Sequence, residues 1–230
     1  MSAHRHPGSS VIVREDACSG LSNLHDDGKR AAVTRIVAGA ARGRRLGVPP
    51  GTGTRPTSDR AREALFSTLE SILGSLAGRR TADLYAGSGA VGLESLSRGA
   101  AHCLLVEADA RALRTLRANA DLVGLPGAEV HGGRVERLVA GSAPGSAYDV
   151  VFLDPPYALA DADVREVLTA MRANGWLAHD AVVAVERSTR GGTWTWPPGL
   201  VGVRWRRYGE ATLWYGRAAD QTAPVEQAGE

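Results

Sequence analysis

The sequence predicts an α/β fold in which a doubly wound, mainly parallel sheet of seven strands carries helices on both faces. Two observations predict it. Short apolar runs alternate with helical stretches over residues 79–217, and such alternation favours a parallel sheet covered on both faces. A glycine-rich turn also joins the first of these strands to a helix, as in folds that bind nucleotides at the carboxyl ends of their strands.

Ahead of this core, the segment 34–78 predicts a β-hairpin, with strands at 35–38 and 44–48, and then a helix that opens near Ser58. Leu65, Leu69, Ile72 and Leu76 give this helix an apolar face at spacings of three and four. In the core, strands are expected near 81–85, 102–106, 128–131, 148–153, 180–186, 201–207 and 211–215. Helices are expected near 90–98, 109–123, 134–140 and 162–173. The last two strands flank a tight turn, which indicates an antiparallel hairpin at one end of the sheet.

The composition bounds the remaining possibilities. With 230 residues, 43% of them hydrophobic, the chain suits one α/β domain with small additions. Residues 1–33 and 218–230 are polar, without sustained periodicity, and predict disordered tails. Cys18 and Cys103 lie far apart without metal-ligand spacing, so we expect neither a disulfide nor a metal site. Because no apolar run could span a bilayer or serve as a signal sequence, we expect a cytoplasmic protein, and we expect it to be a monomer.

The residues Asp154-Pro155-Pro156-Tyr157 follow an apolar strand at 148–153 and are typical of methylation of a planar amino group. The lone pair of such an amine is delocalised into the ring. A carboxylate and a backbone carbonyl that accept its N–H bonds return the lone pair to nitrogen, and prolines fix the direction of that carbonyl. An aromatic ring can hold the base by stacking. The alternative is an ordinary turn, since Asp and Pro are common turn formers.

About seventy residues upstream, Gly87, Gly89 and Gly92 form a G-x-G-x-x-G pattern between a strand and a helix. Glu107 ends the next strand, twenty positions after Gly87, where a carboxylate can bind a ribose diol. The same pattern occurs in nicotinamide-dependent oxidoreductases. Against that alternative, Asp83 would lie beside the pyrophosphate, no proton-transfer pair for a hydride substrate is evident, and the Asp154 loop has no role in a dehydrogenase.

At these residues the chain resembles class I S-adenosylmethionine-dependent methyltransferases. Residues 83–89 look like their first motif, 106–109 like their acidic second motif, and 154–157 like their amino-methylating fourth motif. Five further segments narrow the resemblance to the RsmD family: 35–39, 43–46, 55–60, 62–66 and 208–213. The likeness covers about residues 34–216. This family methylates N2 of a guanine in small-subunit (16S) ribosomal RNA.

The resemblance implies a Rossmann-like methyltransferase core at 79–217 that uses S-adenosylmethionine and no metal. The implied cofactor residues are Asp83, Tyr85, Ala86, Gly87, Gly89, Glu107, Ala108, Arg134 and Val135. The implied catalytic residues are Asp154, Pro155, Pro156 and Tyr157. Arg134 departs from the family, whose members often carry an acid there, so recognition of the adenine is left open.

Basic residues concentrate in two places. Between residues 34 and 62 there are seven arginines against one acid, Asp59, and a second cluster at 204–207 is interleaved with aromatic residues. Such clusters on a nearly neutral chain indicate contacts with RNA phosphates, although a solvated charged face is the alternative. The predicted RNA-binding residues are Arg42, Arg44, Arg45, Arg55, Arg60 and Arg62. The expected partner is ribosomal RNA or the assembling small subunit.

Three other functions use similar residues. Related amino-methyltransferases act on DNA adenine or cytosine, but these usually carry a larger target-recognition insertion than this chain has room for. Others act on a protein glutamine, and they more often have Asn in place of Asp154. A non-catalytic RNA-binding module with a relic pocket would have no reason to keep Asp83, Glu107 and Asp154 together.

Overall fold

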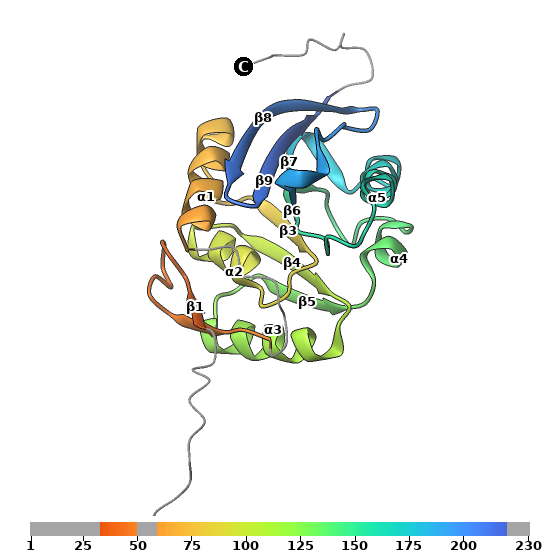
Figure 1. The fold of residues 1–230 in the computed structure, drawn as a ribbon. Coiled ribbons are helices and arrows are strands. Elements are labelled where there is room, and N and C mark those ends of the chain that lie inside the picture. Colours follow the sequence, from red (N-terminus) through yellow and green to blue (C-terminus); the bar gives the residue numbers. More distant parts are fainter. Residues whose placement is uncertain (1–32, 50–58, 220–230) are drawn as a thin grey trace, which may run out of the picture. The chain divides into compact units, whose positions relative to one another are not determined.

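The computed structural model describes residues 33–49 and 59–219. Its main feature is a seven-stranded sheet in the order β5-β4-β3-β6-β7-β9-β8 (Figure 1). The strands are β3 (Arg80–Leu84), β4 (His102–Glu107), β5 (Ala128–Gly132), β6 (Tyr148–Leu153), β7 (Leu177–Ser188), β8 (Leu200–Tyr208) and β9 (Ala211–Ala218). Strands β3 to β7 pair in parallel, while β9 runs antiparallel to β7 and β8. The predicted fold class is therefore confirmed, including the antiparallel hairpin at one end.

Helices cover both faces of the sheet (Figure 1). They are α1 (Asp59–Leu73), α2 (Ala90–Ser97), α3 (Ala110–Val123), α4 (Val135–Val139) and α5 (Asp161–Ala173), and a 3₁₀ turn, η1 (Thr189–Gly191), follows β7. One apolar cluster joins α4 and α5 to the sheet, and two others join α1, α2 and α3 to its opposite face. The central strands β3, β4 and β6 are buried on both faces, which explains why they read as continuous apolar runs. None of the helices in the described part is long and apolar enough to cross a membrane.

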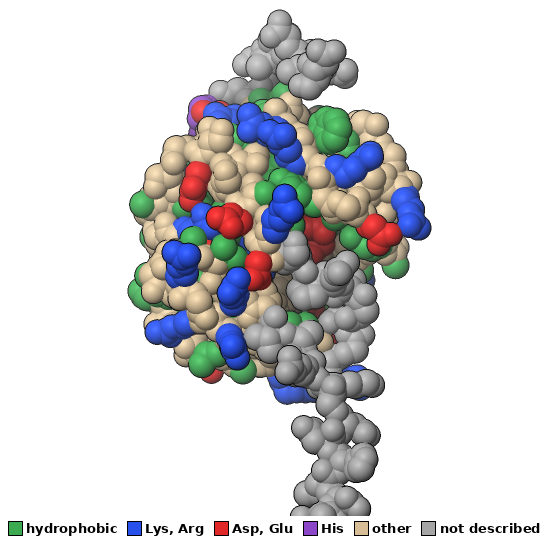
Figure 2. All heavy atoms as spheres, turned by 60° about the vertical axis from the view of Figure 1, so that its left-hand side comes forward, with side chains coloured by type: hydrophobic (Ala, Val, Ile, Leu, Met, Phe, Trp, Pro, Cys, Tyr) green, Lys and Arg blue, Asp and Glu red, His purple; other side chains and the backbone are tan. Residues whose placement is uncertain are grey.

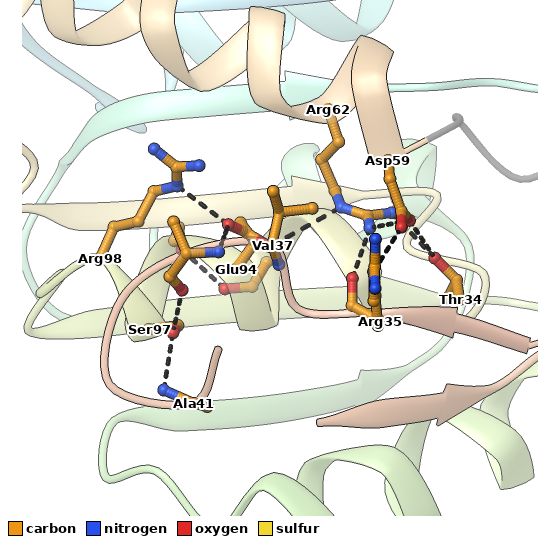
Figure 3. A network of polar contacts seen from close by, with 12 residues as sticks. Thr34, Arg35, Val37, Ala41, Asp59, Arg62, Glu94, Ser97 and Arg98 are labelled. Atoms are coloured by element: carbon orange, nitrogen blue, oxygen red, sulfur yellow. Dashed lines mark hydrogen bonds and ion pairs between the residues drawn. The ribbon is translucent and has the colours of Figure 1, made fainter. Parts of the chain in front are cut away.

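The N-terminal segment is a small hairpin of β1 (Val33–Arg35) and β2 (Arg45–Gly47), docked onto α2 (Figure 3). The side chain of Glu94 on α2 is fully buried, and its oxygens accept the N–H groups of Val37 at 2.6 Å and Ala38 at 2.9 Å. Gly39 packs so closely that a Cβ there would lie 1.8 Å from the Ser97 carbonyl oxygen. The predicted strand 35–38 is found at 33–35 instead, and it ends early because the N–H groups of Val37 and Ala38 bond to Glu94 and not to a partner strand.

Most other element boundaries agree with prediction to within one or two residues. There are three exceptions. Strand β7 begins at Leu177 and not at 180, because Leu177 already pairs with Tyr148 ahead of a register shift that includes Asp180 with its left-handed φ of 60°. Strand β9 ends at Ala218 and not at 215, and α1 ends at Leu73, so Leu76 lies beyond the helix on which it was predicted. Strand β1 begins at Val33, one residue inside the predicted N-terminal tail. Residues 1–32, residues 50–58 with Arg55, and residues 220–230 lie outside the described residues.

Candidate active site

A cleft of about 970 Å³ lies at the carboxyl ends of the strands, where the strand order reverses between β3 and β6. Four of its lining residues are those of the loop after β6, Asp154, Pro155, Pro156 and Tyr157. Eight of the nine predicted cofactor residues also line it: Asp83, Tyr85, Ala86, Gly87, Glu107, Ala108, Arg134 and Val135. The fold thus brings together two motifs that are about seventy residues apart in the sequence, as ligand sites of doubly wound sheets require.

The ninth residue, Gly89, lies behind the cleft. It has a φ of 79°, and a Cβ added there would lie 2.3 Å from a methyl group of Leu116 on α3. Gly89 is therefore required for packing of the turn against α3. Gly87, with a φ of 56°, has open space around its missing Cβ, so this glycine leaves room for a ligand to approach the backbone.

Asp83 fixes the start of α2 to the end of β3. Its buried carboxylate accepts the N–H of Gly92 at 2.8 Å, and Gly92 lies so close to the sheet that a Cβ would meet the Cys103 sulfur at 2.8 Å. Burial raises the pKa of Asp83 to about 7; the Gly92 hydrogen bond opposes this, and the nearby Asp154 and Glu107 carboxylates add to it. Asp83 is thus a neighbour of both motifs, held at the back of the cleft.

Glu107 ties the glycine turn to the end of β4. One carboxylate oxygen accepts the N–H of Gly87 at 2.8 Å, and the other accepts the N–H of Asp109 at 2.7 Å. Asp109 in turn caps α3 by accepting two N–H bonds from its first turn. These bonds hold the Glu107 carboxylate at the cleft, with acceptor capacity left for a ligand hydroxyl group.

On the far side of the cleft, Tyr85 takes a left-handed φ of 68° and its hydroxyl donates to Glu136 at 3.1 Å. Glu136 also pairs with Arg134 at 3.5 Å, and the Arg134 side chain is 67% exposed. Sequence reasoning missed Glu136, which lines the cleft two positions after Arg134. An acid is therefore present in the first turn of α4 although it does not follow the glycine directly.

The loop after β6 presents its reacting groups to the cleft. Asp154 is exposed, and Tyr157 is 50% exposed. The walls around Asp154 desolvate its carboxyl and raise its pKa to about 6, while the Arg187 cation acts in the opposite direction. The carbonyl oxygen of Pro156 accepts the N–H of Leu159 at 2.8 Å, so that carbonyl serves the turn of the loop itself.

Arg187 holds this loop from behind and was also missed by sequence reasoning. It lies near the end of β7, is 8% exposed, and donates to the Leu159 carbonyl oxygen at 2.6 Å and to Asp161 at 2.7 Å. The N-terminal segment likewise contributes Val48 and Pro49 to the cleft wall. Only the three-dimensional arrangement brings these residues to the site.

The predicted RNA-binding arginines differ in their surroundings. Arg42, Arg45 and Arg60 are exposed, and Figure 2 shows that arginine side chains outnumber acidic ones on the face that carries α1 and the N-terminal hairpin. Arg44 is exposed too, but it donates to the carbonyl oxygens of Leu122 at 2.8 Å and Val123 at 2.6 Å at the end of α3.

The prediction for Arg62 is wrong. Its side chain is fully buried, and it donates to Thr34 at 3.1 Å and to Asp59 at 2.9 Å beneath the N-terminal hairpin (Figure 3). A guanidinium with no exposed surface cannot serve as a surface contact for an RNA phosphate. Arg62 instead joins α1 to the N-terminal hairpin.

Comparison with known proteins agrees with this architecture. A family model described as conserved hypothetical protein 95 matches residues 34–217. The chain is 37% identical to ribosomal RNA small subunit methyltransferase D of Escherichia coli K12, over 71% of this chain and 79% of the relative. It is 34% identical to a putative rRNA methyltransferase of Bacillus subtilis, over 66% and 81%. The solved structure of a putative methyltransferase from Escherichia coli superposes with a TM-score of 0.70 at 33% identity, covering 81% of this chain and 98% of that one.

The fold and the cleft define a class I S-adenosylmethionine-dependent methyltransferase. Within this class, the chain belongs to the RsmD family, the family that the matching model describes as conserved hypothetical protein 95.

Proposed function

We propose that this protein transfers a methyl group from S-adenosylmethionine to the exocyclic N2 amine of a guanine in small-subunit ribosomal RNA. The observation that carries the proposal is the cleft, in which the Asp154 loop faces the glycine turn and Glu107. The names of the relatives support the RNA substrate, because two proteins named as ribosomal RNA methyltransferases are 37% and 34% identical to this chain over the aligned residues.

The residues present fit the cofactor. A volume of about 970 Å³ lies within the range typical of small-molecule sites. Glu107 supplies a fixed carboxylate for the ribose hydroxyls, the open space at Gly87 leaves room for the methionine portion, and Val135 and Glu136 line the wall where the adenine would lie. The cofactor, when bound, supplies an electrophilic methyl group on its sulfonium.

The protein's own residues would then activate and position the amine. Above pH 6 the Asp154 carboxylate is ionised and can accept an N–H bond from the amine. Of the two proline carbonyls, that of Pro156 already serves the loop turn, so we assign the second acceptor to Pro155. Tyr157, half exposed at the mouth, provides a stacking surface worth about 1–3 kcal/mol.

Positioning accounts for most of the expected rate. Holding the amine and the methyl group in line corresponds to effective molarities of about 10⁵–10⁸ M. After transfer the nitrogen must lose a proton. Asp154, whose pKa of about 6 lies close to neutral pH, can accept it and release it to solvent through the open side of the cleft.

The direct test is methylation by purified protein of in vitro transcribed small-subunit ribosomal RNA, alone and assembled with ribosomal proteins. We expect N2-methylguanosine in the hydrolysed nucleosides by mass spectrometry, and none with Asp154→Ala. Methylated adenosine or cytidine, or label in a ribosomal protein instead of RNA, would overturn the guanine assignment and favour one of the related amino-methyltransferases.

A further inference from the structure

We infer that β8 carries a second RNA-binding surface, on which a base stacks against Trp205 while Arg207, on the same face of the strand, contacts a flanking phosphate. The inference rests on the proposed function, since it assigns a place to the RNA beyond the target nucleotide.

The side chain of Trp205 is exposed to solvent, although tryptophan is usually largely buried. Its exposure is 55%, and that of Val203, which lies two positions earlier at a bulge in β8, is 40%. The exposed large hydrophobic residues of the described chain are Leu122, Tyr157, Val203 and Trp205. Two of these four therefore lie on one short stretch of β8, and a third, Tyr157, belongs to the loop that would hold the target base.

A row of paired residues connects the two places. Leu153, which directly precedes Asp154, pairs with Val185 of β7. Val185 pairs with Trp214 of β9, and Trp214 pairs with Trp205 of β8. The rings of Trp205 and Trp214 lie 5.8 Å apart between centroids. Trp205 thus lies in register with the end of β6, three strands away along the same edge of the active site.

A small pocket is lined by both Tyr157 and Trp214. Its volume is about 90 Å³, and its walls also include Arg187 and Trp194. Aromatic surfaces therefore follow one another from the catalytic loop, through Trp214, to the exposed ring of Trp205. A single strand of nucleic acid is typically bound by such a series, because each base can stack on an aromatic face whatever its identity.

The charge around Trp205 is complementary to RNA. The strand 200–208 contains three arginines and no acid, and all three arginines are exposed. None of the three forms an ion pair within the described part of the chain, whereas Arg44 and Arg62 of the N-terminal region are used in structural contacts. Arg207 lies on the same face as Trp205, and Arg204 and Arg206 lie on the opposite face. A base stacked on Trp205 would therefore have the Arg207 cation beside it, where a flanking phosphate would lie.

The experiment compares RNA binding by Trp205→Ala, Trp205→Phe and the wild type, with in vitro transcribed small-subunit ribosomal RNA as the probe. Loss of one stacked base should weaken binding about five- to a hundredfold, and Trp205→Phe should retain most of the affinity. Trp205 lies outside the cleft, so its replacement should leave the affinity for S-adenosylmethionine unchanged. The Trp205→Phe variant also keeps an aromatic ring against Trp214 and controls for the loss of that contact.

The salt dependence of RNA affinity separates the contribution of base stacking from that of phosphate contacts. Arg207→Ser should flatten the log–log slope of RNA affinity against salt by about 0.7–0.9, whereas Trp205→Ala should shift affinity at every salt concentration without changing the slope. Arg137→Ser, on the exposed side of α4, is the matched control and should do neither.

Two failures can be told apart. If the wild type methylates RNA while Trp205→Ala and Arg207→Ser bind it normally, the β8 surface is overturned and the proposed function stands. If the wild type methylates no RNA, the proposed function fails first, and the β8 surface fails with it.

Discussion

The two walls of the cleft are built in different ways. On the cofactor wall, the carboxylates of Asp83 and Glu107 each accept backbone N–H bonds at 2.7–2.8 Å, which fix the glycine turn to the strands around it. On the acceptor wall, Asp154 and Tyr157 are exposed, and the described contacts of their loop come mainly from behind, through Arg187.

This difference follows from what each wall must bind. A small cofactor of fixed shape is best held by a preorganised backbone, because less conformational entropy is lost on binding. A base that belongs to a large RNA must enter and leave, so its reacting groups have to remain open to solvent. We therefore expect mutations on the cofactor wall to act on affinity and mutations on the acceptor wall to act on the rate of transfer.

The largest effect should come from Asp154→Ala, which removes the acceptor of the amine N–H. We expect methyl transfer to fall by orders of magnitude in single-turnover measurements, while calorimetry shows S-adenosylmethionine affinity changed less than tenfold. Asp154→Asn keeps an acceptor oxygen without the charge, so its rate of methyl transfer should lie between those of the wild type and Asp154→Ala. Near-normal turnover of Asp154→Ala would remove the proposed role of this residue and the contrast between the walls.

Glu107→Ala tests the cofactor wall. Charge-assisted hydrogen bonds to ribose hydroxyls are worth roughly 1.5–3 kcal/mol, so the affinity for S-adenosylmethionine should fall about ten- to a hundredfold. Glu107 also accepts the N–H groups of Gly87 and Asp109. Glu107→Gln keeps one acceptor oxygen and is therefore the control for the loss of these backbone contacts. Binding of a nicotinamide dinucleotide without binding of S-adenosylmethionine would restore the dehydrogenase alternative.

The pH dependence of transfer should report on the acceptor wall. Asp154 has to be ionised to accept an N–H bond, and its pKa is about 6. The rate should therefore be constant at higher pH and fall about tenfold per unit as the pH drops below 6. In Asp154→Asn this limb should disappear, because an amide does not titrate. A limb that persists unchanged in Asp154→Asn would assign it to another group.

The sequence predicts where the two main motifs of the cleft meet better than it predicts the residues that support them. Strand ends, glycine spacing and the Asp154 motif are local patterns, and their meeting point follows from the topology of a doubly wound sheet. Arg187, Val48 and Pro49 reach the site only through tertiary packing, so no local pattern marks them.

The arginines of the N-terminal segment show most clearly that local patterns do not predict tertiary packing. Within a basic segment every arginine looks alike, yet Arg62 is fully buried against Asp59 and Glu94, while Arg42 is exposed. Which arginine becomes buried depends on where α1, α2 and the N-terminal hairpin meet. The sequence fixes the charge of the segment, but only the packing separates structural cations from those available to a ligand.

The smallest effect should come from the N-terminal arginines that remain exposed. Replacing Arg42 and Arg45 together with Ser should flatten the salt dependence of RNA binding by about 1.4–1.8 in log–log slope if each contacts a phosphate. Arg44→Ser is the matched control: it should cost roughly 0.3–1 kcal/mol of stability, since Arg44 caps the carbonyl groups at the end of α3.

Neither variant should alter the affinity for S-adenosylmethionine, because none of these three side chains lines the cleft. If the double variant binds RNA like the wild type at every salt concentration, Arg42 and Arg45 belong only to a solvated face. RNA contacts would then have to come from Arg60, from Arg207 of β8 and from the acceptor wall, and loss of RNA affinity in Arg207→Ser but not in Arg60→Ser would place the bound strand on the β8 side of the cleft.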